Sequence, residues 1–126
     1  MERRIDLSNL DLDRAAGLIA ERLPEWSTWG LTVRPPTWMD NEAGWPRPLH
    51  LERREVRSPM SLGLQVEGQE ELVFAQFVLY AGGWADADYL PAGGEDLICE
   101  YAELDDVAEF GPLLDRVVIQ LRSATP

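Results

Sequence analysis

The side chains that could do covalent chemistry are few in this chain. Nucleophilic catalysis requires an activated nucleophile beside a base, and the sequence holds one histidine, His50, one cysteine, Cys99, and no lysine. His50 alternates with leucines beside charged residues, which is typical of a solvated or hydrogen-bonded histidine on a strand. Cys99 follows Leu97 and Ile98, so we expect a buried thiol that acts as a small apolar side chain. The sequence therefore predicts that the protein is not an enzyme.

A metal site is the next chemical possibility. Zinc takes about three or four Cys, His or carboxylate ligands, more than one histidine and one cysteine can supply. Asp86 and Asp88, followed by Glu95 and Asp96, carry oxygen atoms of the kind that bind calcium or magnesium. Their spacing is not that of an EF-hand loop, and acidic loops are more often simply solvated. We therefore expect no metal and no cofactor.

The balance of charge is strongly acidic and uneven along the chain. There are 23 acidic and 11 basic residues, a formal net charge of −12. Residues 61–126 hold thirteen acidic residues and two arginines, a net of −11, which leaves −1 for residues 1–60. Such a field repels phosphate, so nucleic acid is not an expected partner, whereas a basic protein would be attracted. The alternative is that the acidity serves only solubility.

Five tryptophans are many for 126 residues, and four of them lie between positions 26 and 45. We expect Trp26 and Trp29 to cover the core beside the first helix. Trp84 differs because it lies among acidic residues after Gly82-Gly83, where it could serve the core or an interface. An aromatic side chain surrounded by carboxylates is a suitable anchor for a basic protein. The predicted partner-binding residues are Trp84, Asp86, Asp88, Tyr89, Glu95 and Asp96.

The elements that must position these residues begin with a helix. Asp11 is a suitable N-cap for a helix with apolar residues at helical spacing from Leu12 to Leu23, and Pro24 is expected to end it. Residues 25–48 are rich in tryptophan, proline and turn formers, which predicts an irregular segment with one short strand near 31–34.

The second half of the chain has the alternating pattern of strands. We expect strands over 49–56, 61–67, 72–81 and 96–103, with a loop over 82–95 that contains Trp84, Asp86 and Asp88. A turn over 105–110 and a helix that starts at Pro112 close the chain. The order predicts one α+β domain over residues 1–126: an N-terminal helix, an antiparallel sheet of about four to five strands, and a C-terminal helix, with the helices on one face.

The expected location is the cytoplasm. A single cysteine cannot form an internal disulfide, which fits a reducing compartment. No apolar stretch approaches the roughly 20 residues needed to span a bilayer, so a membrane is not an expected partner.

Residues 61–121 resemble a family of small binding proteins. An alternating strand over 61–66 and the apolar strand 72–80 precede Gly82-Gly83-Trp84 and the acidic segment 85–89; Gly93-Gly94-Glu95 then leads to a strand and a final helix. This order resembles small immunity proteins of bacterial polymorphic-toxin systems, particularly the TriTu-like group. In that group an aromatic-Ser-Gly-Glu element stands where this chain has Tyr80-Ala81-Gly82-Gly83.

The resemblance implies an α+β fold without catalysis in the bacterial cytoplasm, with a cognate toxin domain as the partner. Together with the acidity, it predicts an immunity protein that neutralises a basic toxin domain by occlusion. The alternative is a non-catalytic adaptor or chaperone subunit of a bacterial secretion or regulatory assembly. An enzyme that uses a carboxylate pair in a cleft is a third, weaker possibility.

Overall fold

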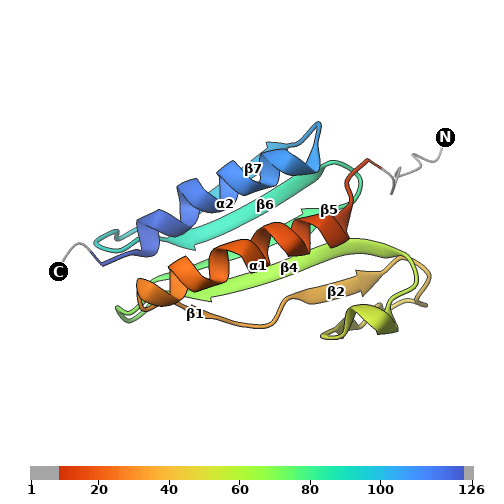
Figure 1. The fold of residues 1–126 in the computed structure, drawn as a ribbon, viewed down its shortest axis with the longest axis horizontal. Helices are drawn as coiled ribbons and strands as arrows, with labels where there is room; N and C mark the ends of the chain where they lie inside the picture. Colours follow the sequence, from red (N-terminus) through yellow and green to blue (C-terminus); the bar gives the residue numbers. More distant parts are fainter. Residues whose placement is uncertain (1–8, 124–126) are drawn as a thin grey trace.

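The computed structural model describes residues 9–123 (Figure 1), which form one antiparallel sheet and two α-helices. The sheet order is β3-β2-β4-β5-β6-β7, and β1 pairs with the end of β4 beyond β2. The α+β class is confirmed, but the sheet has seven strands rather than four or five. Their bounds are β1 Thr32–Val33, β2 Thr37–Asp40, β3 Leu49–His50, β4 Pro59–Glu67, β5 Phe74–Tyr80, β6 Trp84–Leu90 and β7 Ile98–Glu103.

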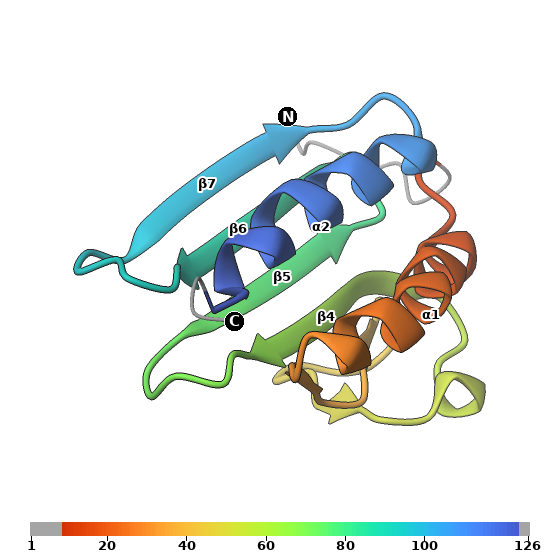
Figure 2. The same ribbon diagram turned by 60° about the vertical axis from the view of Figure 1, so that its left-hand side comes forward.

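The two long helices, α1 (Leu12–Thr28) and α2 (Phe110–Val118), lie side by side on one face of the sheet (Figures 1 and 2). Strand residues that alternate along β4, β5 and β6 face the helices and are buried. Phe77 of β5 meets Phe110 of α2 edge to face, with ring centroids 6.3 Å apart. The core therefore lies between the helices and the sheet, as expected for a two-layer α+β domain.

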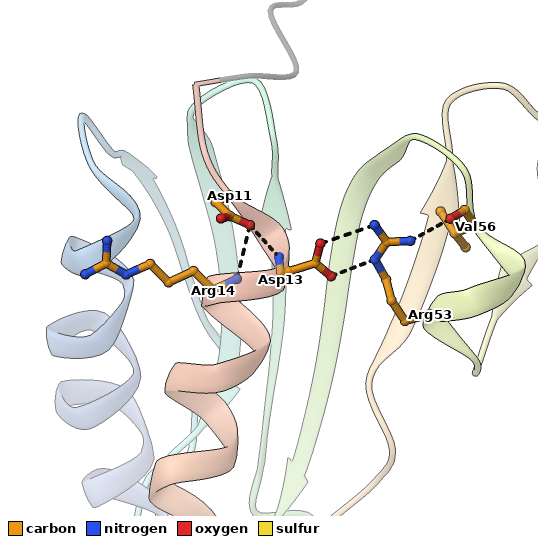
Figure 3. A network of polar contacts seen from close by, with 5 residues as sticks. All are labelled: Asp11, Asp13, Arg14, Arg53 and Val56. Atoms are coloured by element: carbon orange, nitrogen blue, oxygen red, sulfur yellow. Dashed lines mark hydrogen bonds and ion pairs between the residues drawn. The ribbon is translucent and has the colours of Figure 1, made fainter.

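Helix α1 begins where the sequence predicts and ends later. The Asp11 carboxylate accepts the backbone N–H groups of Asp13 and Arg14 at 3.0 and 3.2 Å, which caps the helix (Figure 3). The expected end at Pro24 was wrong, because Pro24 lies inside a helix that continues to Thr28. Trp26, in the turn after Pro24, is only 2% exposed, and its burial offsets the hydrogen bond that proline cannot donate.

The segment between α1 and β4 contains more structure than expected. The sequence did not predict β2, and the strand expected over 49–56 is only β3, followed by a 3-10 turn, η1 (Arg53–Glu55). Arg53 fixes this turn to α1: its guanidinium lies 2.6 and 3.2 Å from the Asp13 carboxylate oxygens and also donates to the carbonyl of Val56 (Figure 3). The ion pair between Arg53 and Asp13 therefore holds this segment as a 3-10 turn beside the start of α1, where an extended strand was expected.

The loop expected over 82–95 was also wrong for its first half, because residues 84–90 form β6. A three-residue connection, Ala81-Gly82-Gly83, joins β5 to β6, and Gly83 has a φ of +118°, which a residue with a side chain rarely adopts. The turn pairs Tyr80 directly with Trp84 across the hairpin. Asp86 and Asp88 alternate with alanines along β6, so the period-two pattern of a strand outweighs the low strand propensity of aspartate.

The C-terminal helix starts two residues before the expected position. Asp106 and Glu109 form a capping box around a 3-10 turn, η2 (Val107–Glu109), which leads into α2 at Phe110, so Pro112 lies in the first turn. A third 3-10 turn, η3 (Ile119–Leu121), follows α2. Within residues 9–123, neither helix is long and apolar enough to cross a lipid bilayer.

Candidate functional site: the open face of the sheet

The face of the sheet that points away from the helices is not covered by any element of residues 9–123 (Figures 1 and 2). Strand register assigns alternate residues of β4 to β7 to this side, because their neighbours in sequence point into the core. We call this surface the open face. Its residues are Gln65 and Glu67 on β4, Phe74, Gln76, Val78 and Tyr80 on β5, Trp84, Asp86, Asp88 and Leu90 on β6, and Cys99, Tyr101 and Glu103 on β7.

A stacked aromatic pair occupies one end of the open face. The rings of Tyr80 and Trp84 lie with centroids 5.0 Å apart and planes inclined by 19°. Burial raises the pKa of the Tyr80 hydroxyl, and the nearby Asp86 carboxylate raises it further. The stack holds both rings against the sheet, so a partner meets aromatic surface that is already ordered.

Acidic residues follow this aromatic pair along β6 on the open face. Trp84, Asp86 and Asp88 are successive same-face residues and span about 13 Å along the strand. Glu103 of β7 pairs directly with Trp84, and Tyr101 pairs with Asp86. The indole is therefore flanked by Tyr80 on β5 and by a carboxylate on β7.

The central strands β4 to β7 carry no basic residue of their own beside these carboxylates. Residues 58–115 contain thirteen acidic residues and no arginine, lysine or histidine. Arg34, which comes from the segment after β1, binds Glu67 at 2.9 Å at the β4 side of the face. Arg116 lies on α2, behind the sheet, and binds Glu100 at 2.6 Å. The charged side chains that β5, β6 and β7 themselves place on the open face are consequently all acidic.

The predicted contact residues divide between three places. Trp84, Asp86 and Asp88 lie together on the open face. Tyr89 lies on the opposite side of β6, is 2% exposed, and donates its hydroxyl to Glu100. Glu95 and Asp96 are exposed in the turn between β6 and β7, at the end of the hairpin far from Trp84. The structure thus brings three of the six residues onto one surface and places Tyr89 in the core.

The surroundings of Tyr89 explain its place in the fold. Burial raises the pKa of its hydroxyl, and the hydrogen bond to Glu100 raises it further. The pKa of Glu100 is lowered, first by its hydrogen bonds from Arg116 and then by the one from Tyr89. These three side chains join β6, β7 and α2 on the helix side of the sheet, so they stabilise the two layers rather than meet a partner.

Cys99 is not buried, contrary to the sequence expectation. It lies exposed on the open face at the edge strand β7, opposite Asp88. The interaction with Asp88 and partial desolvation both raise the pKa of the thiol, which lowers its nucleophilicity at neutral pH. Side chains alternate between the two faces along β7, so Cys99 lies on the open face although the apolar residues before it suggest a place in the core.

Other chemical arrangements are sparse. His50, on β3, has its Nδ1 atom 3.6 Å from Glu55 Oε2 at the edge of the sheet remote from Trp84. Among residues 9–123, no three His, Cys, Asp or Glu side chains gather into a group that could hold a metal ion.

Sequence reasoning did not find Tyr80, Tyr101 and Glu103 as parts of the surface. Tyr80 and Trp84 could have been paired by reading Ala81-Gly82-Gly83 as a tight hairpin connection. The β7 residues could not, because their opposition to Trp84 and Asp86 depends on the register set by the longer turn over 91–97.

Comparison of the chain with protein-family models gives no match, and comparisons with curated proteins and with solved structures give none either.

Proposed function

We propose that this protein is an immunity protein, which binds a basic toxin domain through the open face and blocks it by occlusion. One observation carries the proposal: an ordered aromatic pair, Tyr80 and Trp84, lies on a sheet surface that no element of residues 9–123 covers and on which β5, β6 and β7 place only acidic charges. Toxin domains that cleave nucleic acid need a positive surface to hold phosphate, and an acidic surface competes for it. The resemblance of residues 61–121 to small immunity proteins supports the same partner class.

The proposed contact surface follows the geometry. Trp84 forms the aromatic centre, and Asp86, Asp88 and Glu103 supply charge around it. Buried aromatic side chains carry most of the energy in protein interfaces, while surrounding polar groups exclude water and set specificity. The bacterial cytoplasm is the proposed location.

A protection assay tests the function. The protein is co-expressed with the toxin encoded by the adjacent upstream gene, and survival and complex formation are measured. We expect wild-type protein to protect the cell and the variant Asp86→Arg with Asp88→Arg to fail, because it adds four positive charge units to the contact surface.

The matched control is Glu21→Arg with Glu25→Arg, which changes the net charge equally on exposed positions of α1. Both positions are exposed, and position 25 lies in the last turn of α1, where arginine is favourable, so the control should fold and protect. Protection that survives the Asp86 and Asp88 exchange would show that the open face is not the binding surface.

A non-catalytic adaptor or chaperone subunit is the second candidate, and exposed leucines favour it. Leu72 is 76% exposed and Leu97 is 53% exposed, both in turns at one end of the sheet. Apolar side chains in such positions could hold an unfolded segment of a client protein. The two functions separate in the protection assay, because a chaperone would preserve its client's activity whereas an immunity protein would abolish it.

A further inference from the structure

A hollow of about 630 Å³ lies at the end of the open face opposite the aromatic pair. Its apolar walls come from Phe74 and Leu90, which are paired across β5 and β6, and from Leu72 and Leu97 in the two adjoining turns. Leu72 and Leu97 are 76% and 53% exposed. The hollow is therefore an apolar surface left open to water at the edge of the acidic sheet.

Leu72 has an unusual backbone conformation for a leucine. Its φ of +70° makes it the one non-glycine residue among residues 9–123 in the left-handed region. Glycine or asparagine would hold the same turn with less strain. The chain instead carries an aliphatic side chain there and exposes most of it, and strained residues of this kind gather at binding sites.

The carboxylates around the hollow determine which kind of partner it can bind. The lining residues include Glu70 and Glu71, together with Glu67, which Arg34 binds from outside the lining, and no basic residue. Glu95 and Asp96 immediately precede Leu97 in the sequence. A second copy of this chain would bring an equally acidic surface to the hollow, which like-charge repulsion opposes. A basic partner segment that carries an apolar residue complements both the apolar walls of the hollow and its acidic rim, which the surrounding carboxylates form.

We propose that the hollow receives one aliphatic or aromatic side chain from a segment of the basic partner, next to arginine or lysine residues that bind the acidic rim. The inference rests on the proposed function and adds a second contact to it. Trp84 and Leu90 mark the two ends of β6, about 20 Å apart. That length suits a protein interface of standard size, with an aromatic contact at one end and an apolar socket at the other.

A peptide series tests the hollow directly. The probe is a fluorescein-labelled Arg-Lys-Leu-Arg-Phe-Lys-Arg peptide, and its counterpart has serine in place of leucine and phenylalanine. Fluorescence anisotropy at low ionic strength measures both affinities. We expect the apolar peptide to bind wild-type protein about tenfold more tightly than the serine peptide, because it buries one large side chain.

Two variants test whether the preference for the apolar peptide arises at the hollow. Leu72→Asn should remove the difference between the peptides, whereas Leu51→Asn, at a leucine that is 64% exposed beyond the lining of the hollow, should preserve it. Leu72→Gly supplies a folding control: it relieves the positive φ, so its thermal midpoint should equal or exceed that of the wild type while the preference is lost.

The outcomes separate the inference from the proposed function. Equal binding of the two peptides to wild-type protein, or an undiminished preference in Leu72→Asn, would overturn the socket even if the protein protects against its toxin. Absence of binding by either peptide would also overturn it. The proposed function stands or fails on the protection assay with the Asp86 and Asp88 exchange.

Discussion

Arg22 of α1 binds Asp115 of α2 through two parallel contacts, Nε to Oδ1 at 2.7 Å and a terminal nitrogen to Oδ2 at 3.2 Å. The same guanidinium donates to the carbonyl of Leu18, which orients it along α1. The pair joins the two helices on the far side of the molecule from the open face. It therefore provides a way to change stability without touching the proposed interface.

Asp115→Ala should lower the free energy of unfolding by about 1 kcal/mol, because two-bond pairs of this kind exceed ordinary surface ion pairs. Urea denaturation followed by circular dichroism gives the value. Glu21→Ala is the control, since Glu21 meets Arg22 only at 4.0 Å and should change stability little. Binding of the proposed toxin partner should be the same in both variants at temperatures where they are folded. Reduced binding by folded Asp115→Ala would mean that the helix side takes part in recognition.

Trp84→Ala should weaken partner binding by about tenfold or more, because it removes the central aromatic contact from the acidic surface. Isothermal titration calorimetry with the toxin domain measures the change. Trp45→Ala is the matched control: Trp45 is 84% exposed and lies outside the open face. Equal losses in the two variants would indicate a general effect of tryptophan removal and would argue against a contact at Trp84.

Acid should destabilise the fold partly through Asp40. Backbone N–H groups of Arg57, Glu42 and Ser58 donate to its carboxylate and lower its pKa in the folded protein. A lowered pKa adds stability above the unfolded value of about 3.9, and this contribution is lost as the pH falls through the folded value. Glu100, held by Arg116 and Tyr89, adds a contribution of the same sign.

Asp40→Asn should therefore be less stable than the wild type at neutral pH, and its stability should fall less steeply between about pH 5 and pH 2. Urea midpoints at a series of pH values give both slopes. Glu42→Gln is a suitable control because the Glu42 backbone, not its side chain, contacts Asp40. Parallel slopes for Asp40→Asn and wild type would remove Asp40 as a source of the acid sensitivity.

Association with the proposed basic toxin partner should be fast at low ionic strength and slower as salt is added. Exposed charges are screened beyond about 10 Å at 0.1 M salt, so the long-range attraction between an acidic face and a basic partner weakens. Stopped-flow measurements in increasing sodium chloride should show a clear fall in the association rate constant and a smaller change in the dissociation rate constant. An association rate independent of salt would mean that the acidity serves solubility alone.

Sequence patterns predicted the elements that bury the same side along their whole length. The Asp11 cap, the strand after residue 61 and the apolar strand after residue 72 appear where their patterns indicate, because each has one face fixed by the core. Two errors came from local rules. Pro24 does not end α1, since burial of Trp26 favours one more helical turn. The aspartates on the outward side of β6 indicate a loop by composition, although the segment is a strand.

The surface itself was only partly predictable. Trp84, Asp86 and Asp88 were identified by type, and the strand pairing explains why they share one side. Tyr89 was misplaced because a one-residue step along a strand reverses the direction of the side chain. The two residues that lie opposite Trp84 depend on two strand registers, one set by the turn between β5 and β6 and the other by the turn between β6 and β7. No short sequence window contains both turns.

The meander of β4, β5, β6 and β7 places the centre of the open face in one continuous stretch of the sequence. Strands that are neighbours in the sheet are also consecutive in the chain, so residues 59–103 encode the central surface without interruption. Recombination within that part of the gene would exchange the outward residues as a block, provided that the alternate, inward positions kept their size and apolar character. If the open face is the binding surface, as proposed, one such event could supply a new recognition surface while α1 and α2 continue to pack against the inner side of the sheet.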